Sequence, residues 1–443
     1  MKLPVAPPAF DHLLKKFSGS LDTILGRRIG PEVDGVYEPW DHLRHLEPPG
    51  GLLTEQWWLA IKLARIPIFR DLPLRDGLGR PILLAVTDSM LRRLHFIDRE
   101  AAGAIKGLDR ADGPGDRERY LFRSLVEEAM TSSQLEGAST TRQVAKEMLD
   151  SGRQPRDRSE RMIYNNFQVM QQLRRWREQP LTPKSIFEMH RVLTSDAIDE
   201  ADAAGRFRRA DEQIQVINTD GKVLHQPPPA DELPARLDAL CAFANEADKE
   251  DFLHPVLRAI ALHFQVGYDH PFVDGNGRTA RALFYWSMLR SGYWLTEYLS
   301  ISSVLKRAPA KYARAYLHTE TDESDLGYFV SHQLGVICQA VEGLQGYLAR
   351  KATEQRQAAS LLRPDSALAI RLNHRQRELL LHAVRHAGAI YRIAEHRSTH
   401  QVTYQTARTD LLGLVAEGLL RQRKQGKAFA FVTPPDLAKR LQR

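Results

Sequence analysis

Residues 270–281 read His-Pro-Phe-Val-Asp-Gly-Asn-Gly-Arg-Thr-Ala-Arg, and this stretch decides both the fold and the chemistry expected of the chain. A helical apolar repeat from about His254 runs into it, and a second one starts at Arg278. Pro271 has no backbone N–H and disfavours helical geometry at the preceding residue, so we expect the first helix to end near His270. The four residues 274–277 then form a turn before a new helix N-terminus, where free N–H groups and the helix dipole favour an anion.

The side chains of this turn suit a polyphosphate. Gly275 and Gly277 let the backbone approach phosphate oxygens without a Cβ in the way. The amide of Asn276 can donate to a phosphate oxygen. Arg278 and Arg281 lie three residues apart, so they project from one side of the new helix and can bind further phosphates.

Two more residues add chemistry at the two ends of the loop. Asp274 can hold Mg²⁺, which binds proteins through one or two carboxylates together with phosphate oxygens. His270 has an ordinary pKa near physiological pH and suits the deprotonation of an incoming hydroxyl. Each feature alone has a simpler interpretation as a turn, a solvated face or a structural histidine. Their concentration in one segment favours a site for phosphoryl-type transfer.

The stretch resembles the signature of the Fic family, His-Pro-Phe-x-Asp-Gly-Asn-Gly-Arg-x-x-Arg, and every fixed position matches. The similarity extends over roughly Ser124 to Tyr298. Fic proteins are helical enzymes that mostly transfer AMP from ATP to a hydroxyl side chain of a target protein. The resemblance implies these roles: His270 as general base, Asp274 as Mg²⁺ ligand, Asn276 as α-phosphate donor, Gly275 and Gly277 as the backbone anion hole, Arg278 and Arg281 as ligands of the outer phosphates, and Phe272 as the core anchor.

Two further segments gain meaning from this resemblance. Residues 214–218 and 223–225 fit a β-hairpin around the Asp220-Gly221 turn, and Gly205 to Arg208 just before it also looks like the family. Family members carry such a hairpin as a flap that aligns the backbone of the target. The resemblance therefore implies a docking role for Gln215, Val216 and Ile217, whereas the hairpin alone would be an ordinary surface feature.

Ser132 to Gly137 ends a strongly helical run, with Gly137 as a natural C-cap. It resembles the inhibitory motif of the family, Ser/Thr-x-x-x-Glu-Gly/Asn, placed N-terminal to the Fic core. There the glutamate pairs with the second signature arginine, which implies a Glu136–Arg281 pair that competes with the γ-phosphate of ATP. In some relatives the same glutamate serves to remove AMP, and this alternative stays open.

The C-terminal part carries the positive charge of the chain. Of the net +7, residues 364–443 contribute +8 (14 Lys and Arg, 6 Asp and Glu), so the preceding residues sum to −1. Helices over 375–387, 391–396 and 403–417, followed by a hairpin over 419–432, resemble a winged helix-turn-helix domain. DNA contacts are then expected from Tyr404, Gln405, Thr406 and Arg408 on the recognition helix, and from Arg421, Arg423, Lys424 and Lys427 on the wing. Protein binding is the alternative.

The expected fold class is mainly α, with a Fic-type helical bundle, a small β-hairpin flap and a C-terminal winged helix. The predicted parts are an N-terminal arm and helical region (1–115), a Fic domain with its inhibitory helix (116–345), a helix and linker (346–370) and the winged helix (371–443). No signal peptide or membrane helix is expected, and the two distant cysteines, Cys241 and Cys338, fit a reducing cytoplasm.

The predicted function is that of a protein adenylyltransferase that uses ATP and Mg²⁺, modifies a Ser, Thr or Tyr hydroxyl, and is autoinhibited by Glu136. Self-modification and a homodimer are expected in addition. Two alternatives remain. One is a DNA-binding transcriptional regulator whose Fic core senses nucleotide. The other is an enzyme that removes AMP or uses another donor.

Overall fold

The structure is a computed structural model and describes residues 2–102, 114–218, 220–245, 252–362, 371–386, 388–425 and 428–441. The chain divides into two units, which are residues 1–103 with 122–341, and residues 104–121 with 342–443. The N-terminal region and the signature loop thus lie in the same unit. The helices of the first unit and those that enter it are α1 (Phe10–Lys16), α2 (Leu21–Gly26), α3 (Trp40–Leu43), α4 (Thr54–Arg65), α5 (Asp88–Ile97), α6 (Pro114–Leu135), α7 (Arg142–Ser151), α8 (Arg158–Trp176), α9 (Pro183–Thr194), α10 (Leu233–Asn245), α11 (Pro255–Asp269), α12 (Asn276–Arg290), α13 (Ile301–Arg307), α14 (Pro309–Thr321) and α15 (Gly327–Leu361).

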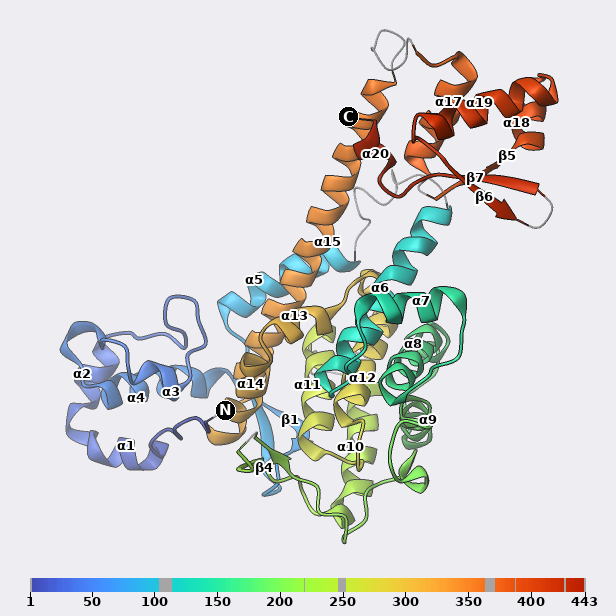
Figure 1. Cartoon of the computed structure of the whole chain (residues 1–443). Helices are drawn as coiled ribbons and strands as arrows, with labels where there is room; N and C mark the ends of the chain where they lie inside the picture. Colours follow the sequence, from blue (N-terminus) through green and yellow to red (C-terminus); the bar gives the residue numbers. More distant parts are fainter. Residues whose placement is uncertain are drawn as a thin grey trace. The chain divides into compact units, whose positions relative to one another are not determined.

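Helices α11 and α12 form the centre of this unit, and they carry the signature loop between them (Figure 1, yellow). Nearly every side chain of both helices is buried, polar ones included. A helix that is covered on all sides needs other helices around it, and α8, α9 and α10 supply part of that cover. The loop that joins α11 to α12 is therefore held at both ends by a buried helix.

Local sequence explains where the covering helices begin. Asp157 caps α8 by accepting a hydrogen bond from the Glu160 N–H at 2.8 Å, and α9 starts with a capping box between Thr182 and Ser185. Pro183 and Pro255 occupy the first turns of α9 and α11, where a missing N–H costs nothing. Helix positions in this part of the chain thus follow from capping residues and from burial together.

The hairpin expected before α10 is present as β3 (Val216–Ile217) and β4 (Val223–His225), an antiparallel pair. It is shorter than the sequence suggested, and position 219 of its turn lies outside the described residues. Asn218 closes the turn, because its side-chain oxygen accepts from the N–H groups of Asp220 and Lys222 at 2.9 and 2.8 Å. Ile217 is exposed, whereas His225 at the other end is buried.

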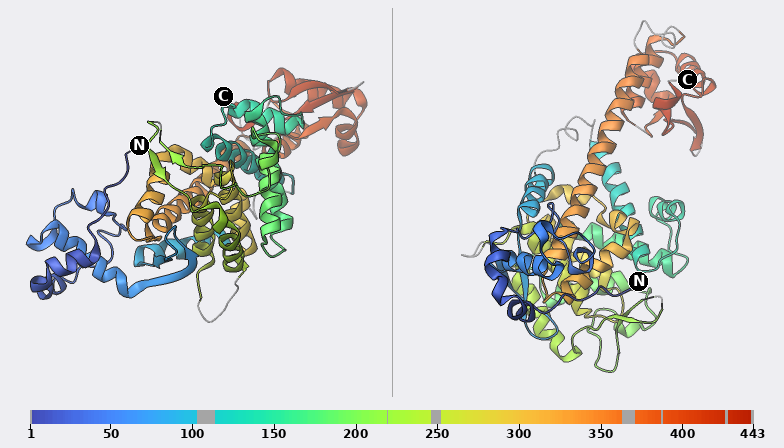
Figure 2. Two further views of the ribbon diagram at one scale, coloured as in Figure 1. Left: turned by 90° about the horizontal axis from the view of Figure 1, so that it is seen from below. Right: turned by 90° about the vertical axis from the view of Figure 1, so that its left-hand side faces the viewer.

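A second antiparallel hairpin, β1 (Phe69–Arg75) with β2 (Pro81–Ala85), was not expected from the sequence. Leu72 and Leu74 point inward with period-two spacing, and the turn between the strands runs from Asp76 to Gly79. Pro73 lies between the two leucines, and a proline in an alternating stretch argues against a strand. The N-terminal helices have an apolar core of their own, to which Trp57 and Trp58 contribute, and they stay grouped in both views of Figure 2.

The second unit contains a mixed C-terminal fold. Its described elements after α15 are α17 (His374–Arg385), β5 (Ile390–Arg392), α18 (Ile393–His400), α19 (Tyr404–Ala416), β6 (Arg421–Gln425), β7 (Ala428–Val432) and α20 (Leu437–Arg440), with the strands in the order β5-β7-β6. The expected helix over 391–396 differs from this arrangement, since its start is strand β5. The expected linker around residue 364 and the wing turn with Lys427 lie outside the described residues.

Inside this unit, α19 is fixed by a buried carboxylate. Asp410 accepts from Arg375 Nε at 2.7 Å and from Asn373 Nδ2 at 2.7 Å, and His396 Nε2 lies 3.2 Å from it. Because burial of an unpaired carboxylate is costly, these partners fix which face of α19 points inward. Both cysteines are free thiols, and Cys241 is buried while Cys338 is only partly so. Among the described residues, no helix is both long and apolar enough to cross a membrane.

A buried arginine ties the N-terminal region to α15. Arg65 is fully buried and donates to Tyr328 Oη at 2.6 Å and to the carbonyl oxygens of Pro31 and Glu38, both at 3.0 Å. Its guanidinium lies 3.7 Å from the buried carboxylate of Asp325. One side chain therefore satisfies partners from two loops and a helix.

Replacement of this arginine should unfold the unit more easily. We expect Arg65→Met to lower the free energy of unfolding by about 3–5 kcal/mol, because the substitution leaves the Asp325 carboxylate buried without its cation. Chemical denaturation followed by tryptophan fluorescence measures the change. The matched variant Arg44→Met, at an exposed position, should stay within about 0.5 kcal/mol of the wild type. An equal, small effect of both substitutions would contradict the assigned role of Arg65.

Candidate active site

His270 stands at the end of α11 in a left-handed backbone conformation, with φ +41° and ψ 59°. Helix α11 ends at Asp269, and the sequence predicted its end near His270. The Nδ1 atom of His270 donates to the carbonyl oxygen of Gly267. Since a carbonyl oxygen can only accept, Nδ1 carries the hydrogen of the neutral ring, and the lone pair is on Nε2. The Nε2 atom is therefore the proton acceptor that this ring offers.

The surroundings of His270 keep its ring neutral. Burial lowers the pKa of His270 to about 4, and the neighbouring charge of His225 acts in the same direction. The carboxylate of Glu136 and the hydrogen bond to Gly267 oppose this shift without cancelling it. At neutral pH, therefore, the ring is deprotonated and competent to accept a proton.

The loop after His270 is clamped by Asn276. Its side chain donates to the carbonyl oxygen of Phe272 at 2.8 Å and accepts from the Phe272 N–H at 2.9 Å, and it is buried. The ring of Phe272 is fully buried and stacks on His190, with ring centroids 3.7 Å apart. The asparagine thus fixes the backbone of the loop in addition to the phosphate contact predicted for it.

His190 of α9 supports the backbone of the loop, a role that no sequence pattern indicated. Its Nε2 lies 2.8 Å from the Asp274 carbonyl oxygen, and its Nδ1 accepts from the Gly205 N–H at 2.9 Å. Burial lowers the pKa of His190 to about 4, so this ring is also neutral. A histidine on an apolar helix face gave no signal of this role, because its partners are backbone groups distant in sequence.

Gly275 shows why the loop needs glycine. It has φ +80°, and a Cβ there would come within 2.8 Å of Thr194 Cγ2. It is also the N-cap of α12, which begins at Asn276, two residues earlier than the apolar repeat indicated. The first N–H groups of α12 have no partner within the helix, so they face the space next to residues 275–277.

Both signature arginines are buried in α12. Arg278 donates from Nη1 to the carbonyl oxygen of Leu193 at 3.0 Å, but its Nε and Nη2 find no hydrogen-bond partner among the described residues. The nearest acid is Asp274, whose carboxylate lies 3.6 Å from Nη2. Buried donors without acceptors are costly, so a further anion beside this guanidinium would stabilise it.

Arg281 is bound by the end of α6. It donates from Nε to Ser132 Oγ at 2.8 Å, and from Nη2 to the Ser132 carbonyl oxygen at 2.9 Å and to Glu136 Oε1 at 2.8 Å. Gly137 follows with φ +95°, which ends the helical run and turns the chain away. Two residues of the predicted inhibitory motif, Ser132 and Glu136, thus contact Arg281, and Gly137 follows them directly.

The Glu136 carboxylate occupies the space in front of α12. A Cβ placed on Gly277 would collide with Glu136 Oε1, so the carboxylate lies directly against the glycine. Burial alone would raise the pKa of Glu136, but Arg281, and to a lesser degree Arg278, hold it below its ordinary value. An ionised carboxylate therefore rests where a helix N-terminus and two arginines favour a phosphate. The residues present fit a nucleotide polyphosphate on this ground.

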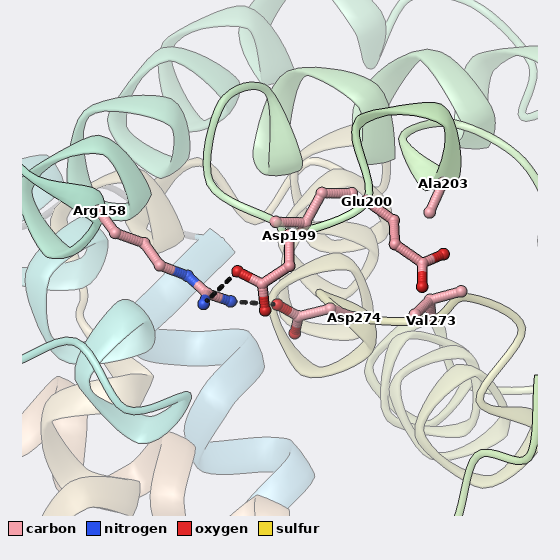
Figure 3. A pocket seen from close by; sticks show the side chains of 7 residues that line it. Arg158, Asp199, Glu200, Ala203, Val273 and Asp274 are labelled. Atoms are coloured by element: carbon pink, nitrogen blue, oxygen red, sulfur yellow. Dashed lines mark hydrogen bonds and ion pairs between the residues drawn. The ribbon is translucent and has the colours of Figure 1, made fainter.

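Asp274 borders a pocket of about 280 Å³ whose walls include Arg158, Asp199 and Glu200 (Figure 3). The Asp274 side chain is 36% exposed, and Arg158 lies 3.5 Å from it and 3.0 Å from Asp199. The described residues contain no group of three or more His, Cys, Asp or Glu side chains that could hold a metal ion. A Mg²⁺ ion at Asp274 would therefore need phosphate oxygens and water as its other ligands, which is how Mg²⁺ usually binds beside nucleotides.

Comparison with known proteins agrees with this geometry. Residues 180–288 match the profile of the Fic/DOC family. We call residues 180–288 the Fic/DOC segment. It covers the hairpin β3–β4, the loop and most of α12, so the residues that the signature predicted lie inside it, while the motif around Glu136 lies upstream.

The chain is distantly related to proteins named protein adenylyltransferase Fic. Over 117 residues, the chain is 34% identical to the protein adenylyltransferase Fic of Nematostella vectensis, a match that spans 26% of this chain and 25% of that protein. The match to the protein adenylyltransferase Fic of Drosophila grimshawi is 30% identical over 210 residues, or 46% of this chain and 40% of that protein. The chain thus spans less than half the length of these relatives. A crystal structure of a Fic family protein from Desulfovibrio desulfuricans G20 has the same fold, with a TM-score of 0.51, 17% identity, and coverage of 79% of this chain and 97% of that one.

The remaining predicted residues lie elsewhere in the structure. Gln215, Val216 and Ile217 belong to or adjoin β3 of the Fic/DOC segment. The C-terminal residues Gln405, Arg408, Arg421 and Lys424 are exposed in the second unit. No sequence pattern indicated His190 or Arg158, and Arg208 was indicated only by the resemblance to the family.

The neutral His190 of the Fic/DOC segment predicts a pH-dependent stability. Its ring is fully buried and is protonated in the folded protein only near pH 4, whereas in the unfolded chain it is protonated near pH 6.5. The unfolded state therefore binds more protons between these values, and stability falls as the pH falls through them. Between pH 7 and pH 5, we expect the wild type to lose roughly 2 kcal/mol more than His190→Gln. Urea unfolding at both pH values measures this difference, and the exposed-site control His12→Gln should behave as the wild type does. Equal pH dependence in the wild type and His190→Gln would rule out the proposed linkage.

Proposed function

We propose that the protein is a protein adenylyltransferase that transfers AMP from ATP to a hydroxyl side chain of a protein target and is inhibited by its own Glu136. The observation that carries the proposal is the position of the Glu136 carboxylate, against Gly277 at the N-terminus of α12 and 2.8 Å from Arg281. The unsatisfied donors of Arg278 add a second argument for an anion at this place. The distant relationship to protein adenylyltransferases also supports AMP transfer.

In the proposed reaction, the target hydroxyl attacks the α-phosphorus of ATP. The new oxygen–phosphorus bond forms as the bond to the departing pyrophosphate breaks. The proton of the hydroxyl passes to Nε2 of His270, which the hydrogen bond to Gly267 leaves free of hydrogen. The N–H groups of residues 275–277, the amide of Asn276 and the two arginines would bind the phosphates. Most of the catalytic effect would come from positioning and charge.

Asp274 is the proposed ligand of Mg²⁺. Bound there, the ion would neutralise phosphate charge and orient the leaving pyrophosphate. The Arg158 guanidinium pairs with the carboxylates of both Asp274 and Asp199, so it can keep one ion pair if Asp274 binds a cation.

Autoinhibition follows from competition for the same donors. A γ-phosphate and the Glu136 carboxylate cannot both bind Arg281, since the carboxylate already uses its Nη2. The end of α6 is also held in place, because Glu128 is buried and accepts from the Ser302 N–H at 3.0 Å and from Ser300 Oγ at 2.8 Å. Release would therefore require a movement of the last turn of α6.

The flap is the proposed docking place for the target. The sheet of β3 and β4 has two strands, and no further described strand pairs with the outer edge of β3. An extended segment that carries a Ser, Thr or Tyr could add there, with Gln215, Val216 and Ile217 next to it. A cytoplasmic location, self-modification and a homodimer are further parts of this proposal.

Removal of the inhibitory carboxylate should raise AMP transfer. We expect Glu136→Ala to increase incorporation of label from α-³²P-ATP with Mg²⁺ by about ten- to a hundredfold, the equivalent of one strong charge-assisted contact. Label would be followed on the protein itself and on proteins of a bacterial lysate. Glu127→Ala removes a carboxylate of the same helix that pairs with Arg142, and it should change nothing. Glu136→Ala combined with His270→Ala should abolish transfer.

Two results would decide against parts of the proposal. Equal labelling by the wild type and Glu136→Ala would disprove autoinhibition. No labelling by any variant, although ATP binding is detected by calorimetry, would disprove AMP transfer and favour either nucleotide sensing or another donor. Loss of label from a pre-modified target in the presence of the wild type would indicate AMP removal.

DNA binding by the second unit is a second candidate function. Its helices α17, α18 and α19 with the sheet β5-β7-β6 fit a winged helix, in which α19 would be the recognition helix. The residues of α19 and β6 that were predicted to contact DNA and are exposed are Tyr404, Gln405, Arg408, Arg421, Arg423 and Lys424. Together with the net charge of +8 for residues 364–443, they supply the positive face that a phosphate backbone needs.

If α19 binds DNA, Arg408→Ala should weaken binding of the full chain to a random-sequence duplex and lower the slope of log K against log salt by about one. Fluorescence anisotropy at several salt concentrations gives both values. Arg371→Ala is the control, because the Arg371 guanidinium already pairs with Glu417 at 3.0 Å. No binding at low salt by the wild type would exclude this function.

A further inference from the structure

His225, at the inner end of the flap, has a hydrogen-bond acceptor at each ring nitrogen. Its Nε2 lies 2.6 Å from the carbonyl oxygen of Tyr268, and its Nδ1 lies 2.7 Å from the Glu320 carboxylate of α14. A carbonyl oxygen only accepts, so Nε2 must carry a hydrogen, and the carboxylate takes a hydrogen from Nδ1. This geometry fits a doubly protonated imidazolium, which is unusual for a side chain that is only 8% exposed.

The position of this ring links three parts of the site. His225 ends strand β4 and is paired in register with Val216 of β3, the strand proposed to receive the target. Its acceptor Tyr268 lies in the last turn of α11, two residues before His270. The rings of His225 and His270 have centroids 6.2 Å apart. One side chain thus connects the flap, the end of α11 and the proposed general base.

We propose that His225, held as an imidazolium by Glu320, is a positioning residue that fastens the flap to the end of α11 and keeps His270 unprotonated while phosphates bind. The inference rests on the proposed function for its catalytic meaning. It goes beyond the signature residues, because neither His225 nor Glu320 belongs to them.

The charges around the pair are consistent with this role. Burial alone would lower the pKa of His225, but Glu320 outweighs it and raises the pKa, with help from the Tyr268 carbonyl and Asp269. The charged groups that act on His270 are His225 from β4, Arg208 from the segment before the flap and Glu136 from the turn after α6. Arg208 also donates to the His270 carbonyl oxygen at 2.8 Å. The C-terminal end of α11 is thus capped by two cations, which its exposed carbonyl groups favour.

The chemical need for such a cation is clear from the reaction. A bound polyphosphate brings several negative charges close to His270 and would favour its protonated form, which cannot accept a proton. A fixed positive charge at 6.2 Å from the ring opposes that effect. The pKa of His225 is raised, whereas that of His270 is lowered. The imidazolium form of His225, and with it the ion pair with Glu320, is therefore present at and below pH 6.5 and is lost as the pH rises through the raised pKa.

The experiment measures the protonation of each ring without any nucleotide transfer. Exchange of the histidine C2 hydrogen in D₂O, followed by mass spectrometry across the pH range, gives a titration midpoint for each histidine of the full chain. In the wild type, we expect His225 to titrate above pH 6.5 and His270 well below it. In His225→Gln, the midpoint of His270 should rise by about one pH unit. Glu320→Gln should lower the midpoint of His225 and raise that of His270.

His318→Gln is the matched control, because His318 lies on the same helix as Glu320 and makes its ring contact with Tyr328. It should leave the His270 midpoint unchanged, and circular dichroism would show that each variant is folded. A wild-type His225 that titrates at or below pH 6.5, or a His270 midpoint that is the same in folded His225→Gln and Glu320→Gln, would overturn the proposal.

The catalytic part has its own readout. In the Glu136→Ala background, His225→Gln should move the acidic limb of the transfer rate to higher pH by the same amount as the His270 midpoint. If that background transfers no AMP at all, the proposed function fails while the exchange measurement still decides whether His225 is a cation. If transfer occurs and its acidic limb does not move, the role of His225 in supporting the base is wrong.

Discussion

Two guanidinium groups buried in one helix are the constraint around which this site is organised. Arg278 and Arg281 both lie in α12 with almost no exposed surface. Buried charge is tolerated only where acceptors surround it. The carbonyl oxygens of Leu193 and Ser132 and the carboxylate of Glu136 supply some of these acceptors, and they come from α9 and from the end of α6. The packing of α9 and of the end of α6 against α12 thus depends on hydrogen bonds and an ion pair with the two arginines.

The same constraint connects stability with activity in the proposed enzyme. A carboxylate on Arg281 stabilises the resting protein because it neutralises a buried cation and occupies a helix N-terminus. A polyphosphate would serve both purposes better, but it can bind fully only when the carboxylate leaves. The inhibition proposed for Glu136 has its physical basis in this competition. It follows from one anion site that two anions can occupy.

Around the loop, neutral and charged histidines have distinct tasks that depend on their partners. His190 bonds a carbonyl oxygen with one nitrogen and accepts an N–H with the other, so the neutral ring satisfies both contacts. His225 has an acceptor at each nitrogen, so only the charged ring does. His270 has one fixed hydrogen and one lone pair, which is the arrangement that a general base needs. In the proposed enzyme, the hydrogen-bond partners of each histidine thus determine whether its ring is structural, a cation or a base.

The sequence by itself determined what depends on short range. The turn at His270-Pro271, the glycine positions of the loop and the helix on each side of it follow from backbone preferences within a dozen residues. The motif that ends at Gly137 pointed to a Glu136–Arg281 pair only through a family resemblance, and the structure contains that pair. The strand over Phe69–Arg75 was missed because Pro73 obscured its alternation, and strand β5 because three residues carry too little pattern.

Only the tertiary structure decided which side chains complete the site. The contacts around the loop join residues that are far apart in the sequence, up to 95 residues for the contact between His225 and Glu320. The other side chains of this kind are His190 and Arg208, which bond to backbone carbonyl oxygens. No periodicity or spacing encodes such partners, because they depend on how α9, α14 and the flap pack against α11. The residue types of the signature loop could thus be identified from the sequence, whereas the protonation states of its histidine and of the neighbouring histidines depend on packing.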